Sequence, residues 1–120
     1  MSKILLTRSF TQELSKLRIT TKQEIITVIV QYEKGLPVLL DLYSPEKNIK
    51  VLKGYIRHRR GVRIAVVLEI QKHVYVPFFI AKKTSREGWN LSKYSEIYLS
   101  SKIRRVYRDI KNQLYEKITI

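Results

Sequence analysis

Basic residues crowd one stretch of this chain, between Lys50 and Lys83. Its first cations follow one another without an intervening acid until Glu69. They are Lys50, Lys53, Arg57, Arg59, Arg60 and Arg63, and Lys82 and Lys83 close the stretch. Ammonium and guanidinium groups bind phosphate oxygens, and the planar fork of arginine fits them in pairs. We therefore interpret the stretch as a binding surface for a phosphate polyanion rather than as a solvated face alone.

The whole chain shares this bias toward positive charge. Its 120 residues include 24 Lys and Arg against 10 Asp and Glu, a formal net charge of +14. Such an excess indicates the kind of partner, with phosphate polyanions first, an anionic membrane surface second and an acidic protein third. No apolar run approaches the roughly 20 residues of a membrane helix, and the first residues do not resemble a signal peptide. We expect a cytoplasmic protein with no membrane partner.

Metal and disulfide chemistry have few ligands in this sequence. There is no cysteine, and His58 and His73 are the two histidines. Disulfides and thiolate metal sites are therefore excluded, and a histidine-based metal site is not expected. No metal and no other cofactor is predicted.

The elements that must position the basic stretch begin with a strand and a helix. Residues 4–7 are apolar and β-branched enough for a short strand. Ser9 and Thr11 are both suited to cap a helix over about 11–17. This helix would place its apolar side against a core.

A second helix is predicted after Thr20 or Thr21. Thr21 and Glu24 form a capping-box pattern, and Gly35-Leu36-Pro37 supplies a stop. The run between them is rich in Ile and Val, so a strand stays open as the alternative. Its length, its cap and its stop favour the helix, which would pack against a sheet.

Three strand-like runs then carry the basic residues. Residues 36–48 before them are expected to form a connecting segment, because Pro37 and Pro45 interrupt regular structure. The runs cover residues 49–57, 62–70 and 74–81. The last run is nearly all apolar and is predicted to be central, with a bulge at Pro77.

Tight turns at Arg59-Arg60-Gly61 and Gln71-Lys72-His73 would pair these runs as a meander. Alternation puts Lys53 and Arg57 on one face of the first run. On the second run, Arg63 points away from the face that carries Val62, Ile64 and Val66. If the runs pair, we expect all these cations to gather on one surface, which we call the cationic platform.

After the meander, residues 84–91 are expected to form a loop and a helix is predicted from Ser92. Its apolar positions are Ile97, Ile103, Val106, Tyr107, Ile110 and Leu114. The predicted fold is α+β, a single domain over residues 1–120. It has a small antiparallel sheet, and its elements follow one another along the chain as strand-helix-helix-strand-strand-strand-helix. The two N-terminal helices pack on one face, and the last helix is long.

Four short motifs in this order carry a resemblance to a known family. They are Val51-Leu52-Lys53-Gly54, Gly61-Val62-Arg63-Ile64, Phe79-Ile80-Ala81-Lys82-Lys83 and Tyr94-Ser95-Glu96. In that order, they are similar to a lead-in segment that many members of the family carry, to the start of one of its strands, to its closing strand with two final cations, and to the Tyr-Ser-Glu that follows this strand in some members. With them, the chain resembles the RelE/ParE superfamily of bacterial toxins from type II toxin–antitoxin pairs.

The resemblance implies a metal-independent endoribonuclease that cuts messenger RNA in the ribosomal A site, with the RNA 2′-hydroxyl as nucleophile. Arg63 would then stabilise negative charge on phosphorus, and Lys83 or Lys82 would supply a second cation. His58 is a candidate acid or base, and Tyr94 would stack on a base or position the hydroxyl. The flanking RNA backbone would be held by Lys50, Lys53, Arg57, Arg59 and Arg60.

Two other functions stay open at this point, because a shared fold does not decide activity. One is a gyrase-directed toxin of the ParE type, and the other is a nucleic-acid-binding module without catalysis. The expected partners of the leading hypothesis are messenger RNA, the ribosome and an acidic antitoxin that folds on contact. Any oligomer would form through the antitoxin.

Overall fold

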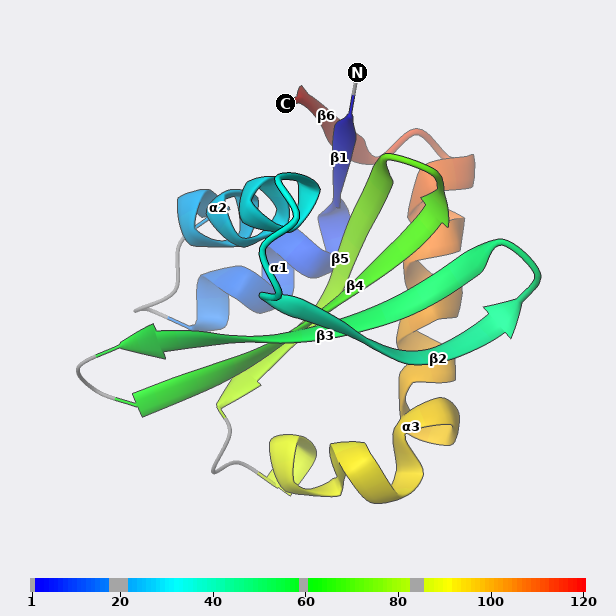
Figure 1. Cartoon of the computed structure of the whole chain (residues 1–120). Helices are drawn as coiled ribbons and strands as arrows, with labels where there is room; N and C mark the ends of the chain where they lie inside the picture. The colour runs from blue at the N-terminus through cyan, green and yellow to red at the C-terminus, as the bar shows by residue number, and fades with distance from the viewer. Residues whose placement is uncertain (1, 18–21, 59–60, 83–85) are drawn as a thin grey trace.

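The computed structural model describes residues 2–17, 22–58, 61–82 and 86–120, and of residues 58 and 86–96 it describes the backbone alone. The strands within these ranges are β1 (Lys3–Thr7), β2 (Leu39–Glu46), β3 (Ile49–His58), β4 (Gly61–Gln71), β5 (Val74–Lys82) and β6 (Tyr115–Thr119). The helices are α1 (Arg8–Lys16), α2 (Lys22–Glu33) and α3 (Arg86–Lys111). Helices cover both faces of the sheet (Figure 1), and because the strands pair mostly antiparallel the α+β class is confirmed.

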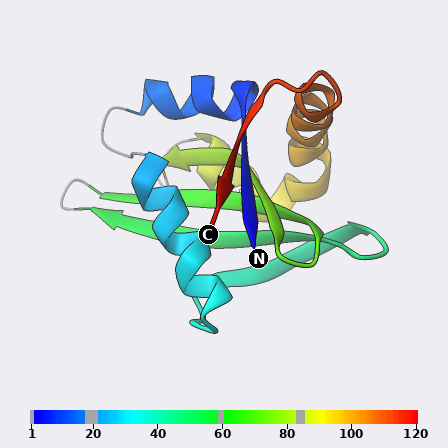
Figure 2. The same cartoon turned by 90° about the horizontal axis from the view of Figure 1, so that it is seen from above.

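The described strands form one mixed sheet of six, in the order β2-β3-β4-β5-β1-β6. β1 runs parallel to β5, whereas the other neighbouring strands are antiparallel. The predicted small antiparallel sheet is therefore wrong in two respects, since one pairing is parallel and β2 and β6 add two strands. β6 lies along β1 and brings the two ends of the chain side by side (Figure 2).

β2 occupies the segment that was predicted to connect α2 to the meander. Its ladder with β3 runs from Leu39↔Gly54 to Glu46↔Ile49 and shifts register twice. Pro45 falls inside the second shift, on a strand at the edge of the sheet, where no inter-strand hydrogen bond is required of it. A proline that would break a central strand is therefore tolerated here.

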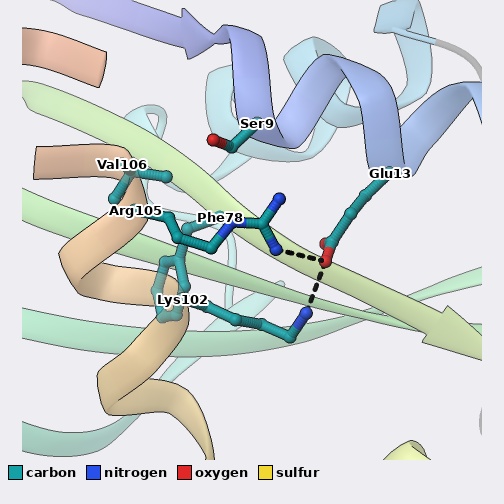
Figure 3. Close-up of a pocket in the computed structure, with 6 residues that line it drawn as sticks. All are labelled: Ser9, Glu13, Phe78, Lys102, Arg105 and Val106. Carbon is teal, nitrogen blue, oxygen red and sulfur yellow. Dashed lines mark hydrogen bonds and ion pairs between the residues drawn. The ribbon is translucent and has the colours of Figure 1, made fainter. Parts of the chain in front are cut away.

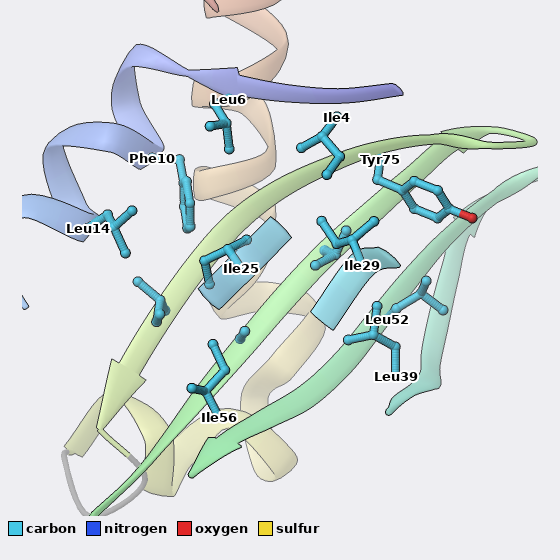
Figure 4. Packing of buried hydrophobic residues seen from close by; sticks show 13 residues of the cluster. Ile4, Leu6, Phe10, Leu14, Ile25, Ile29, Leu39, Leu52, Ile56 and Tyr75 are labelled. Carbon is cyan, nitrogen blue, oxygen red and sulfur yellow. The ribbon is translucent and has the colours of Figure 1, made fainter. Parts of the chain in front are cut away.

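α1 and α2 pack on one face of the sheet, as predicted (Figure 4). They bury Phe10, Leu14, Ile25 and Ile29 against Leu52, Ile56, Ala65, Val67 and Ile80 of the central strands. The strand alternative for residues 22–33 is wrong, because this stretch forms α2. The expected caps of α2, Thr20 and Thr21, lie outside the described residues.

α1 begins earlier than the sequence indicated. Thr7 is its N-cap, and the Thr7 hydroxyl oxygen accepts a hydrogen bond from the Phe10 amide at 3.4 Å. The predicted caps Ser9 and Thr11 are wrong, because β1 passes directly into α1 and leaves no intervening loop. α1 therefore leaves the sheet at the end of β1.

α3 covers the opposite face with Leu99, Ile103 and Val106. Phe78 and Phe79 are consecutive in sequence, yet both pack on this face. The predicted interruption at Pro77 explains this, since the β4–β5 register shifts between Val66↔Phe79 and Val67↔Pro77. The three-stranded meander and its irregularity at Pro77 are confirmed.

The start and the buried side of α3 differ from the prediction. The expected loop over 84–91 is wrong from Arg86 onward, where the helix begins despite Gly88, whose cost in a helix is about 1 kcal/mol. Ile97 is 79% exposed and Tyr107 is 37% exposed, whereas both were expected to face the core. Leu99 takes the buried position instead, four residues before Ile103.

None of the described helices combines the length and the apolar character needed to cross a membrane.

Candidate nucleic-acid site

The ladder between β3 and β4 divides the predicted cations between two faces of the sheet. Arg63 pairs with Ile56, which packs in the core under α1 and α2. Lys53 and Arg57 alternate with Ile56 along β3 and therefore lie on the opposite face, where α3 packs. The prediction of one cationic platform is wrong, because alternation within a strand does not fix which residues of two strands face each other.

Arg63 is also buried, with only 3% of its surface exposed. Its Nη1 would lie 3.6 Å from a Cβ placed on Gly61, so the guanidinium lies back toward the end of the hairpin. Gly61 has φ of 127°, the left-handed region that glycine tolerates, as the predicted turn requires. Arg63 is therefore not presented to solvent on an open strand face.

The other described cations of the meander are more accessible and more dispersed. Lys50 is exposed and lies opposite Glu69 in the β3–β4 ladder. Burial raises the pKa of Glu69, although the charge of Lys50 opposes that rise. The Lys53 ammonium lies 5.7 Å from the centre of the Tyr55 ring, a cation–π contact, and Arg57 is exposed. These residues offer phosphate contacts without forming a catalytic cluster.

Several predicted site residues cannot be placed at the level of side chains. Arg59, Arg60 and Lys83 lie outside the described residues. His58 ends β3 and Tyr94 lies within α3, and in both cases only the backbone is described. Their predicted roles stay predictions.

Lys82 lies at a cleft between α1, the end of β5 and α3. β1 pairs with β5 only at Lys3↔Val74 and Ile4↔Tyr75, so within the described residues the end of β5 faces helices on that side. The cleft has a volume of about 300 Å³. It is lined by Glu13, Lys16, Leu17, Phe79, Ile80, Ala81, Lys82, Tyr98 and Lys102. Three lysines from three elements thus converge on one concave surface.

Lys102 is the most firmly positioned of these lysines. Its ammonium forms an ion pair with the Glu13 carboxylate and lies over the rings of Phe79 and Tyr98, 5.4 Å and 5.9 Å from their centres. The two rings meet edge to face at 5.6 Å. Figure 3 shows Lys102 and Arg105 converging from α3 on Glu13 of α1, with Arg105 Nη1 3.9 Å from Glu13 Oε1. The cation is held before any ligand arrives.

A second contact fixes α1 against α3 near the same place. The buried Asp109 carboxylate accepts a hydrogen bond of 2.7 Å from the Ser9 amide, in the first turn of α1. A carboxylate at that position also meets the positive end of the helix dipole. Together, Asp109 and Glu13 hold the two helices that form the walls of the cleft.

Two buried side-chain atoms lack a hydrogen-bond partner within the described part of the chain, Glu13 Oε2 and Arg63 Nε. One is an acceptor and the other a donor. Both residues neighbour Lys82: Glu13 lines the same cleft, and Arg63 pairs with Lys82 across the β4–β5 ladder. A buried polar atom without a partner costs about 1–3 kcal/mol. The Glu13 Oε2 atom, in a residue that lines the cleft, therefore has capacity for a polar ligand.

Sequence reasoning found Lys82 and Arg63 but missed Glu13, Lys16, Tyr98 and Lys102. Glu13 and Lys102 are 89 residues apart, and no local pattern joins them. Lys102 is one of several cations in the last helix, and nothing in the sequence distinguishes it from the others. The signal that the sequence did carry was the end of the third meander run, where apolar residues stop at Lys82.

Among the described residues, no group of three or more His, Asp and Glu side chains is arranged to hold a metal ion. The cleft therefore offers lysines, a carboxylate and a phenol as its chemical groups. Comparison of the chain with protein-family models, with curated proteins and with solved structures gives no match.

Proposed function

We propose that the protein is an RNA endonuclease that works without a metal and acts as the toxin of a toxin–antitoxin pair on ribosome-bound messenger RNA. The observation that carries the proposal is the pair of unpartnered buried atoms, Glu13 Oε2 and Arg63 Nε: Glu13 shares the cleft with Lys82, and Arg63 pairs with Lys82 across the β4–β5 ladder. The net charge of +14 and the resemblance of the meander motifs to RelE-type toxins support the choice of RNA.

The cleft groups match the needs of cleavage by the 2′-hydroxyl. Glu13 Oε2 takes the hydroxyl proton as the 2′-oxygen bonds to phosphorus and the P–O5′ bond breaks. Lys82 and Lys102 stabilise the added negative charge on the phosphoryl oxygens, and the buried charge of Arg63, which pairs with Lys82 across the β4–β5 ladder, adds to the positive field. Lys16 or Lys82 donates the proton that the leaving 5′-oxygen needs. The products are a 2′,3′-cyclic phosphate and a 5′-hydroxyl.

The more accessible cations serve as contacts to the RNA backbone in this proposal. Lys50, Lys53 and Arg57 lie along β3, outside the cleft. Lys83 follows Lys82 directly and stays a candidate for the cation at phosphorus. An acidic antitoxin that covers the cleft would compete with RNA, and charge complementarity would speed its capture.

Mapping messenger RNA ends after adding the purified protein to translating ribosomes tests the proposal. Cuts in phase with codons, with the cyclic phosphate on the upstream fragment, are the expected result. DNA breaks that depend on gyrase would replace the proposal by the ParE-type activity. Absence of both kinds of break would leave only nucleic-acid binding.

Two lysine variants locate the activity. Lys82→Met should lower the cutting rate about 100-fold or more, as expected when a group that stabilises the transition state is lost. Lys72→Met is the matched control, because it removes the same charge from an exposed turn at the opposite end of β5. Equal rates for the two variants would contradict the location of the site.

Salt dependence tests the RNA contact itself. The logarithm of the affinity for a single-stranded RNA should fall with the logarithm of the salt concentration, by about 0.7 for each phosphate contacted. A flat profile would contradict the assignment of a polyanion ligand.

A further inference from the structure

A second concave surface lies on the other side of α3, between that helix and the edge strand β2. It has a volume of about 490 Å³. Its walls include Tyr43 and Glu46 from β2, and Ser100, Ile103, Arg104 and Tyr107 from α3. None of these residues lines the cleft around Lys82. We call this surface the β2–α3 groove.

The groove combines an aromatic and apolar lining with a few polar groups. Ile103 is buried in the core beneath α3, and Tyr107 is 37% exposed. Burial raises the pKa of the Tyr107 phenol, and the nearby charge of Glu46 adds to that rise. The phenol therefore stays protonated at neutral pH and offers a neutral ring. Neutral aromatic faces of this kind stack on unpaired bases.

Arg104 gives the groove a contact for phosphate. Its Nε donates to the Ser100 carbonyl at 3.4 Å, which holds the side chain along the helix. Arg108 and Lys111 follow on the same helix at helical spacings, and all three are exposed. A strand of RNA that passes along α3 would thus meet positive charge beside the groove.

The Glu46 carboxylate gives the groove a means of distinguishing one base from another. Within the described chain no hydrogen bond or ion pair engages its carboxylate. An ionised carboxylate has only acceptors, so it fits two adjacent donors. The Watson–Crick edge of guanine has such a pair in N1–H and the exocyclic amine. Adenine and cytosine place an acceptor beside their amine, and uracil has a single donor between two acceptors.

We propose that the β2–α3 groove holds one unstacked guanine of a bound RNA, with Tyr107 against the base, Glu46 on its Watson–Crick edge and Arg104 on the phosphate. The inference deepens the proposed RNA binding and rests on it. It adds a specificity site that is separate from the cleft where cutting is proposed.

Short oligonucleotides made of 2′-O-methyl nucleotides are suitable probes, because they lack the nucleophile and cannot be cut. One probe contains adenosines only, the second has a single central guanosine, and the third has inosine there, which lacks the exocyclic amine. At constant salt, anisotropy titrations should show about tenfold tighter binding of the guanosine probe than of the adenosine probe. The inosine probe should fall between them.

Variants separate the two contacts. Glu46→Gln should bring the guanosine and adenosine probes to the same affinity, while Tyr107→Ala should weaken all probes about tenfold through lost stacking. Tyr115→Ala is the matched control, since Tyr115 is also 37% exposed but lies on β6 and does not line the groove. The Tyr115→Ala variant should bind all probes as tightly as the wild type does. Thermal unfolding of each variant shows that the fold is retained.

Equal binding of the guanosine and adenosine probes by the wild type would overturn the inference. So would a guanosine preference that survives in Glu46→Gln. A guanosine preference without any cutting on ribosomes would support the groove and contradict the endonuclease proposal. Cutting without a guanosine preference would support the endonuclease proposal and contradict the groove.

Discussion

Glu13 and Glu33 occupy similar positions and have different surroundings. Each extends from an N-terminal helix to another element, and their side chains are 20% and 18% exposed. Glu33 Oε1 accepts hydrogen bonds from the Tyr75 hydroxyl at 2.5 Å and His73 Nδ1 at 3.0 Å, and Oε2 lies 3.1 Å from the same nitrogen. Glu13 engages Oε1 with Lys102 and Arg105 and leaves Oε2 buried without a partner among the described residues.

The difference separates a structural carboxylate from one with capacity for a ligand. Glu33 ties α2 to the β4–β5 hairpin, and Figure 4 shows Tyr75 extending from that hairpin at the edge of the core. Both carboxylate oxygens of Glu33 already have partners within the protein. Glu13 pairs with two cations and still has an acceptor to offer, in a cleft that contains three lysines. Exposure alone would not distinguish the two residues.

The largest expected effect is on cutting by Glu13→Gln. Loss of a positioned general base lowers rates by about 100- to 10,000-fold, so messenger RNA cutting should nearly vanish. The amide keeps the shape of the side chain but weakens a largely buried ion pair with Lys102, so the free energy of unfolding should fall by about 1–3 kcal/mol. Single-turnover cutting rates and urea unfolding measure both quantities. A rate close to that of the wild type would remove Glu13 from the mechanism.

Arg63→Met tests the other unpartnered atom. Its Nε has no hydrogen-bond partner among the described residues, which is costly for a buried charged group, so an apolar side chain of similar volume should leave the free energy of unfolding unchanged or raise it. RNA affinity should nevertheless fall, because the positive charge that pairs with Lys82 across the β4–β5 ladder is lost. Urea unfolding and anisotropy titration report the two effects. Lower stability with unchanged affinity would show that Arg63 serves the core alone.

Glu33→Gln, unlike Glu13→Gln, is expected to leave cutting unchanged. It weakens a charge-assisted network with Tyr75 and His73, and the cost should be about 1–3 kcal/mol of unfolding free energy. The network lies outside the cleft, so the cutting rate of the folded variant should equal that of the wild type. A matched loss of cutting in both glutamate variants would mean that the cleft depends on global stability rather than on Glu13.

The sequence predicted the local parts of this fold well and the long-range parts poorly. Alternation and turn residues located the meander, Gly61 and the irregularity at Pro77, because these are properties of neighbouring residues. The faces were misassigned because Ile56, not Arg57, pairs with Arg63, and register depends on both strands together. The Glu13–Lys102 pair was invisible for the same reason, since only the packing of α1 on α3 creates it.

The smallest expected effect is a loss of the contribution of Glu33 in acid. Burial disfavours the charged carboxylate, but hydrogen bonds from Tyr75 and His73 outweigh burial and hold the pKa of Glu33 below its ordinary value of 4.5. A group with a lowered pKa in the folded state stabilises that state fully above its unfolded pKa, and the contribution disappears as pH falls through the folded pKa. The difference in unfolding free energy between the wild type and Glu33→Gln should therefore shrink below a pH of about 4.5. Urea titrations of both proteins at stepped pH measure it. The subtraction cancels the part of the Glu69 contribution that comes from burial, which raises the pKa of Glu69 and has the opposite sign, but not the smaller part that comes from the charge of Glu33. A difference that stays constant through acid pH would mean that Glu33 holds its partners equally well when protonated, and its contrast with Glu13 would then rest on geometry rather than on charge.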